Sequence, residues 1–208
     1  MKLEIYNIQG QKTGREIELP ADIFGVEPNS HAVYLAVKQY MANQRQGTHK
    51  SKERSEIARS TRKAFRQKGT GGARRGDMKS PLVHGGARVF GPRPRDYSFR
   101  LNKKTKQLAR ASALSTKYTS GQITVIEDFV MQAPKTKEFI QILSKFGLGE
   151  KKSLLVTGGY EKNTYLSSRN IPKVSVVEAK DLNTYQVLNA NAVVLSESAI
   201  ATMKEVFA

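Results

Sequence analysis

The sequence contains no cysteine, no tryptophan and no long run of apolar residues. The lack of cysteine excludes a disulfide framework, a thiolate metal site and a cysteine nucleophile. No apolar stretch approaches the length of a membrane span, and the first six residues alternate and carry an acid, unlike a signal peptide. Only 38% of the 208 residues are hydrophobic, which is below the usual share of a globular domain. We therefore expect a soluble, intracellular protein, part of which is not packed into a core.

Positive charge is abundant and unevenly distributed. Lys and Arg number 35 against 18 Asp and Glu, so the net charge is +17. Such a balance predicts a polyanionic partner, with nucleic acid ahead of an anionic membrane. Residues 44–110 hold 20 of the basic residues and four acids, whereas the rest of the chain is nearly neutral. A cationic segment therefore interrupts a nearly neutral body.

Residues 44–96 differ from the body in composition and in pattern. They include 15 Lys or Arg, eight of the 16 glycines and three of the seven prolines, but few large apolar residues. No helical or strand period persists, and the segment cannot bury enough apolar surface to offset the entropy lost on ordering. We expect a long loop over 44–96 that becomes ordered against a partner. The loop would be inserted into a single domain whose body is residues 1–43 and 97–208.

The body shows the alternation of strands and helices that is typical of an α/β fold. Apolar runs and alternation indicate strands at 2–8, 14–19, 123–126, 153–157, 173–178 and 192–195. Helical spacing indicates helices after Ser30, at 104–119, from Pro134 to Gly147, at 161–169, near Tyr185 and after Ser196. One shared face is expected in each of the first two helices, formed by Val33, Val37, Tyr40 and Met41 and by Leu108, Ala111, Leu114 and Tyr118. We predict a parallel-sheet layer domain flanked by helices, with a long basic glycine-rich loop inserted.

Residues that could support catalysis are few and dispersed. The histidines have no spaced partner that would complete a zinc site; they are His31, His49 and His84. Residues 69–74 lack the third glycine of a dinucleotide fingerprint, and Asp77 stands where a phosphate loop needs lysine. Glu127 and Asp128 end a strand, where α/β enzymes place active residues, but adjacent strand residues point to opposite faces. We favour structural roles for these residues and predict no enzyme, no metal site and no cofactor.

The cations of residues 44–96 occur in clusters, interleaved with glycine and with two phenylalanines. Each cation can neutralise a phosphate and release counterions, and glycine lets the backbone approach closely. Phe65 and Phe90 lie among the cations and could stack on bases. A flexible glycine–arginine strand without a recognition helix suits irregular, folded RNA better than the major groove of duplex DNA. The segment is therefore predicted to bind RNA.

Several motifs resemble the bacterial type of large-subunit ribosomal protein four. They are FRQKGTGGAR at 65–74, KSP at 79–81, FGPRPRDY at 90–97, LNKK at 101–104 and APKTK at 133–137. The resemblance covers the whole chain in order. It implies a structural constituent of the large ribosomal subunit in the cytoplasm, with ribosomal RNA and neighbouring ribosomal proteins as partners. It also implies no enzymatic activity, no small-molecule substrate and no membrane partner.

The resemblance further implies that the loop penetrates the ribosomal RNA and helps line the nascent-peptide exit tunnel, beside ribosomal protein twenty-two and the passing nascent peptide. The matching tip consists of Gln67, Lys68, Gly69, Thr70, Gly71, Gly72, Ala73, Arg74 and Arg75. The residues expected to bind RNA are Arg45, Lys50, Arg54, Arg62, Lys63, Phe65, Arg66, Gln67, Lys68, Gly69, Thr70, Gly71, Arg74, Arg75, Lys79, Arg88, Arg93, Arg95, Lys103 and Lys104.

Two other functions stay open at this point. A nucleotide-dependent enzyme on the parallel sheet would need a phosphate loop or paired polar groups at the strand ends, and the sequence supplies neither. A free regulator that binds messenger RNA or nuclease partners could coexist with a ribosomal role; by the resemblance, some members of the family repress their own operon.

Overall fold

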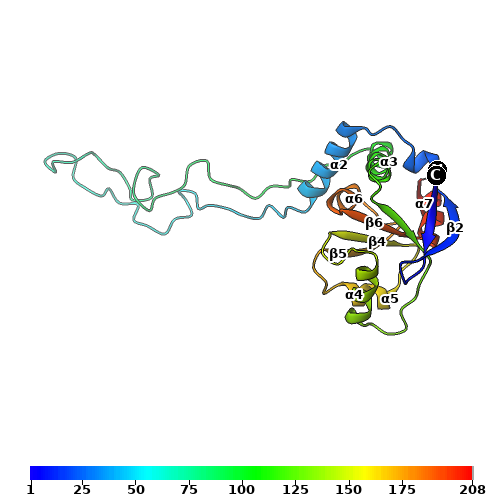
Figure 1. The fold of residues 1–208 in the computed structure, drawn as a ribbon. Helices are drawn as coiled ribbons and strands as arrows, with labels where there is room; N and C mark the ends of the chain where they lie inside the picture. Colours follow the sequence, from blue (N-terminus) through cyan, green and yellow to red (C-terminus); the bar gives the residue numbers. More distant parts are fainter. Residues whose placement is uncertain (208) are drawn as a thin grey trace. The chain divides into compact units, whose positions relative to one another are not determined.

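The computed structural model describes residues 1–207 and divides into two compact units. Unit 1 comprises Met1–Met41 and the chain from Arg100 onward, and unit 2 comprises Ala42–Phe99. The sheet lies wholly in unit 1 (Figure 1), whereas residues 44–99 contain no helix or strand.

A mixed six-stranded sheet forms the centre of unit 1. The strands are β1 (Lys2–Tyr6), β2 (Lys12–Glu18), β3 (Ile123–Ile126), β4 (Ser153–Thr157), β5 (Val174–Glu178) and β6 (Ala192–Ser196). Their order is β2-β1-β3-β6-β4-β5. Every neighbouring pair is parallel except the β1–β2 hairpin. The predicted α/β fold is confirmed, with this hairpin as the one antiparallel pair in a mostly parallel sheet.

Seven helices accompany the strands. They are α1 (Ala21–Phe24), α2 (Ser30–Asn43), α3 (Lys103–Thr119), α4 (Thr136–Lys145), α5 (Lys162–Ser168), α6 (Thr184–Asn189) and α7 (Glu197–Phe207). Gly121 and Gly147 follow α3 and α4 with a φ of 65°, a left-handed conformation that ends helices and favours glycine. Helix α4 begins at Thr136, not at the predicted Pro134. Helix α1 was not predicted, because a single turn is too short to show a period.

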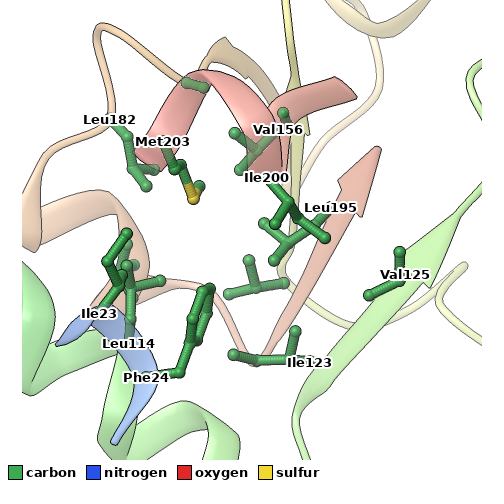
Figure 2. Packing of buried hydrophobic residues seen from close by; sticks show 14 of the residues in the cluster. Ile23, Phe24, Leu114, Ile123, Val125, Val156, Leu182, Leu195, Ile200 and Met203 are labelled. Atoms are coloured by element: carbon green, nitrogen blue, oxygen red, sulfur yellow. The ribbon is translucent and has the colours of Figure 1, made fainter. Parts of the chain in front are cut away.

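Two apolar cores lie on the two faces of the sheet. All five residues of β4 are buried, and they alternate between the cores: Leu154 and Val156 pack in one, and Leu155 packs in the other. The first core receives side chains from α1, α3, α6 and α7, and Figure 2 shows Leu114 and Met203 among them. The second core receives α4. Burial on both faces explains why the central strands β3, β4 and β6 are apolar runs instead of alternating ones.

Helices α2 and α3 do not bury every residue of the faces that their apolar spacing predicts. In α2, Met41 is 55% exposed, and the buried residues of this helix are Ala32 and Gln39. In α3, Leu108 is 38% exposed, while Leu114 and a run of alanines and serines are buried. The serines replace apolar contact with hydrogen bonds: Ser115 Oγ accepts the Val26 N–H at 3.1 Å. Short side chains on α3 thus let the backbone before α2 pack closely against it.

Candidate nucleic-acid interface

Unit 2 consists of an outgoing and a returning arm that lie side by side (Figure 1). Backbone hydrogen bonds of 3.0–3.3 Å connect the arms without forming a regular ladder. Their donor and acceptor residues are Arg95–Gly47, Ser51–Pro92, Arg88–Lys52, Met78–Ser60 and Ala64–Gly76. Because the connections span the length of the unit, cations far apart in the sequence lie along the same narrow element.

Stacked cations and a close backbone contact mark the base of the two arms. Two guanidinium groups contact the Tyr97 ring, with central carbons 3.7 Å (Arg45) and 4.5 Å (Arg95) from its centroid. Such cation–π contacts hold both arms to one ring. Gly47 has a φ of 66°, and a Cβ there would lie 2.2 Å from the Arg95 carbonyl oxygen. Only glycine fits this position, because both the space and the backbone conformation exclude a side chain.

The few acids of unit 2 bind its own cations or backbone. Asp77 receives two hydrogen bonds of 3.0 Å from Arg54 Nη2. A second ion pair joins Glu53 to Arg93 at 2.8 Å, and a third joins Glu56 to Lys50. Predicted RNA-binding residues Lys50, Arg54 and Arg93 are therefore ion-paired in the protein alone. The pairs cross from one arm to the other in two of the three cases, so they help hold the arms together.

Hydrogen bonds shift the pKa of two of these carboxyl groups downward. The hydrogen bond from Lys50 lowers the pKa of Glu56, with help from the backbone N–H of Glu53. The backbone N–H and the hydroxyl of Ser98 donate to Asp96 at 2.8 and 2.7 Å and lower its pKa. Both groups are fully ionised acceptors at neutral pH.

The residues of the predicted tip are all exposed. Glycines 69 and 71 adopt φ values of 77° and 67°, so the backbone turns back where side chains are absent. Arg66 Nη2 donates to the Gly69 carbonyl at 3.0 Å, and Lys63 donates to Gln67. The guanidinium of Arg66 thus braces the turn, while the Phe65 side chain is 52% exposed. The tip therefore presents cations and bare backbone to the surroundings, and the Phe65 ring lies just before it in the chain.

The structure divides the predicted RNA-binding residues between the two units. All of them lie in unit 2 except Lys103 and Lys104, which are exposed in the first turn of α3 in unit 1. In unit 2 every predicted residue is exposed except Lys79, which is half-buried. Cations are disfavoured at a helix N-terminus unless an anion is near, and the first turn of α3 contains no acid. The two lysines therefore add uncompensated positive charge to the first turn of α3.

The sequence did not predict the residues that join the two arms of unit 2 through contacts between distant positions. Tyr97 is 52 positions from Arg45, so nothing local indicates that the two would stack. Phe90 was considered only as a stacking ring, but it also has a φ of 53° and a fully exposed side chain. Leu82 is 93% exposed as well. The sequence does carry one signal for such exposed side chains: a large apolar residue, such as Leu82 or Phe90, that stands alone among cations and glycines.

Glu127 and Asp128, which were considered as catalytic candidates, connect the end of β3 to β2 and to α7. Arg15 Nη2 donates to Glu127 at 2.6 Å. Asp128 accepts hydrogen bonds from the Ser198 N–H at 3.1 Å and the Ser198 hydroxyl at 2.7 Å, at the first turn of α7. These contacts give both acids the structural roles that we favoured. Within residues 1–207, no group of three His, Asp or Glu side chains is placed to hold a metal ion, and no helix is long and apolar enough to cross a membrane.

Comparison with known proteins defines the class as ribosomal proteins. A family model described as "Ribosomal protein L4/L1 family" matches residues 17–206. The chain is 59% identical over 207 residues to "Large ribosomal subunit protein uL4" of Parabacteroides distasonis, covering 100% of this chain and 99% of that protein. The protein of the same name from Porphyromonas gingivalis is 58% identical over the same shares, and that from Flavobacterium psychrophilum is 56% identical over 99% of this chain and 98% of that protein.

The chain therefore belongs to the ribosomal protein L4/L1 family. This membership confirms the resemblance found in the loop motifs. It also makes the chain a structural ribosomal protein and not an enzyme.

Proposed function

We propose that this chain is a structural constituent of the large ribosomal subunit and that unit 2 binds the ribosomal RNA of that subunit. Membership of the family and the name of its relatives support the first part. The cationic, exposed and unpacked character of unit 2 supports the second. On this proposal the protein works on the ribosome in the cytoplasm and has no small-molecule substrate.

One observation carries the RNA-binding proposal: unit 2 concentrates charge without a core to stabilise it. It contains 15 Lys or Arg and four acids, three of which are already in ion pairs within the unit. Like charges held in two adjacent arms repel each other, and a polyanion removes that repulsion. Exposed Phe65 and Phe90 add rings on which unpaired bases can stack. Folded RNA supplies both phosphates and unpaired bases.

The finer part of the proposal concerns the tip. By its resemblance to the family, residues 67–75 would contribute to the wall of the nascent-peptide exit tunnel, next to ribosomal protein twenty-two. The exposure of all nine residues and the two left-handed glycines support an element that is shaped by its surroundings. Repression of its own operon stays a prediction of the same resemblance.

The salt dependence of RNA binding tests the proposal. If about eight cations contact phosphates, the logarithm of the affinity for a large-subunit ribosomal RNA fragment falls against the logarithm of salt with a slope near −6 to −7. A variant of the full chain with Arg62, Arg66, Arg74 and Arg75 changed to glutamine is expected to have a slope smaller by about three. The matched control changes four exposed lysines of unit 1, Lys137, Lys151, Lys162 and Lys204, to glutamine and is expected to keep the slope. An equal loss in the two variants would show that binding is spread over the whole surface and would contradict the proposal.

A further inference from the structure

Strand β5 forms one edge of the sheet and leaves part of its backbone without a partner. It pairs only with β4. In this parallel pair, Ser153 N–H donates to the Lys173 carbonyl and Ala179 N–H donates to the Thr157 carbonyl, both at 2.9 Å. Alternate residues of a strand face opposite sides, so Val174 and Val176 turn their N–H and C=O groups away from the sheet. Within residues 1–207, neither has a backbone hydrogen bond to another segment.

This edge has few of the features that protect edge strands. Its sequence is VSVVE, with no proline, no lysine and no register shift in its pairing with β4. The opposite edge, β2, carries more of these features: it has four charged side chains and a glycine in seven residues, and the register of its pairing with β1 shifts. Natural sheets use charge and irregularity to prevent pairing with another chain. The β5 edge is therefore open to the addition of a strand.

A hollow of about 290 Å³ lies at the carboxyl end of the same edge. Tyr160 and Tyr165 form its aromatic part, with ring centroids 6.3 Å apart and exposed fractions of 64% and 41%. Glu161, Glu178 and Asp181 supply three carboxylates, and Val176 of the edge also lines it. A ring pair beside carboxylates is the environment that binds a lysine or arginine side chain.

The carboxylates of this hollow are unpaired although cations are abundant. The chain has 35 Lys and Arg, and in the described part of it none lies within ion-pair distance of Glu161, Glu178 or Asp181. Among residues 1–207, the one hydrogen bond to these side chains is donated by the Thr164 hydroxyl to Glu161, at 2.9 Å. A phosphate backbone would be repelled here, so the charge favours a cationic occupant.

We propose that the β5 edge binds an extended, basic segment of another protein, which adds a seventh strand to the sheet and places a lysine or arginine side chain in the Tyr160–Tyr165 hollow. The free N–H and C=O groups of Val174 and Val176 supply the main-chain pairing, as in other complexes that form by strand addition. The carboxylates select for positive charge. RNA does not satisfy both features, because it has no peptide backbone. Pairing of two copies through their β5 strands does not satisfy them either, because β5 carries no lysine or arginine.

Photo-cross-linking in assembled large subunits tests which molecule lies on this edge. Benzoylphenylalanine in place of Tyr160 puts a photoreactive aromatic side chain at the hollow. A covalent cross-link to a lysine- or arginine-rich segment of another protein, read by mass spectrometry, is expected. A cross-link to RNA, a cross-link to a second copy, or no cross-link would overturn the proposal.

Titration of the free full-length protein with a labelled synthetic peptide tests the chemistry. The peptide alternates valine and arginine over seven residues, and its control carries glutamate in place of arginine. The N–H of Val176 points away from β4, so Val176→Pro removes this N–H without removing a hydrogen bond within the sheet. Proline is tolerated at such a position on an open edge. We expect it to weaken binding at least tenfold, whereas Val176→Thr keeps the N–H and binds as before.

A second variant changes the charge of the hollow and leaves the backbone of β5 unaltered, so its result does not depend on how proline affects the strand. Glu178→Gln combined with Asp181→Asn is expected to weaken binding about tenfold, and Glu150→Gln, an exposed acid elsewhere in unit 1, has no effect. Equal binding of the arginine and glutamate peptides would overturn the proposal. RNA affinity of the same variants is expected to stay unchanged, so this result is independent of the RNA-binding function of unit 2.

Discussion

Single residues at the base of unit 2 determine how its two arms are joined. Gly47 touches the returning arm with its backbone, and Tyr97 holds a guanidinium of each arm on its ring. Neither contact involves an apolar core. Changes at these residues are therefore expected to alter the arms and leave unit 1 folded.

The first prediction concerns Gly47→Ala. The new Cβ would lie 2.2 Å from the Arg95 carbonyl oxygen, so the arms must separate at their base. We expect faster amide hydrogen exchange at Arg95, whose N–H donates to the Gly47 carbonyl, and an unchanged exchange rate in β4. The control is Gly72→Ala, where no atom lies within 4 Å of the added Cβ. Equal exchange in both variants would argue against a close contact at Gly47.

A second prediction follows from the lowered pKa of Asp96. Because the folded-state pKa lies below the unfolded value, the stabilisation from the Ser98 hydrogen bonds is present above the unfolded pKa and is lost as the pH falls through the folded pKa. Ser98→Ala removes the hydroxyl donor and keeps the backbone N–H. A carbon NMR titration of the Asp96 carboxyl should show a partial rise of the pKa in this variant. Ser55→Ala, at an exposed serine that makes no contact with Asp96, serves as control.

At the scale of elements, α3 illustrates how burial departs from spacing. Leu114 is fully buried in the first core, whereas Leu108 on the same helix is 38% exposed. Leu114→Ala is expected to cost about 3 kcal/mol of unfolding free energy, because it leaves a cavity. Leu108→Ala, an identical chemical change, is expected to cost less than about 1 kcal/mol. Urea denaturation followed by circular dichroism measures both, and similar losses would contradict the packing of α3.

The strands and most helices could be predicted because their signal is local. Apolar runs mark β3, β4 and β6, and left-handed glycines end α3 and α4. The buried face of α2 could not be predicted, because spacing does not reveal that Gln39 is buried while Met41 is exposed. The Arg45–Tyr97 stack joins residues 52 positions apart, and no local pattern encodes such a contact.

At the scale of the whole molecule, the apolar cores that stabilise the fold and the excess positive charge lie in different parts of the chain. The apolar clusters lie in unit 1, and unit 2 holds 15 Lys or Arg and only Val83 and Ala87 as buried apolar residues. Such a division lets binding residues change without a change in folding. It also explains why the charge pattern of the sequence indicated the interface more clearly than any single motif in the body did.

This division predicts the behaviour of Lys68→Glu at the exposed tip. RNA affinity at low salt should fall on the order of tenfold, because a cation becomes an anion in a cationic surface. The melting temperature of the free protein should change by less than about 2 °C, since an exposed substitution alters stability little. Lys151→Glu, exposed in unit 1, is the matched control and should leave the affinity nearly unchanged. A large loss of melting temperature for Lys68→Glu would show that the tip contributes to the fold.

The strand order has a consequence for synthesis. The middle of the sheet is built from β3, β6 and β4, and β6 is the last strand along the chain. Translation therefore delivers every cation of unit 2 before the residues that close the apolar centre exist. The growing polypeptide therefore exposes these cations to cellular RNA before its sheet is complete. A chain that ends before Ala192 lacks β6, the strand that joins β3 to β4, and we expect it to be degraded.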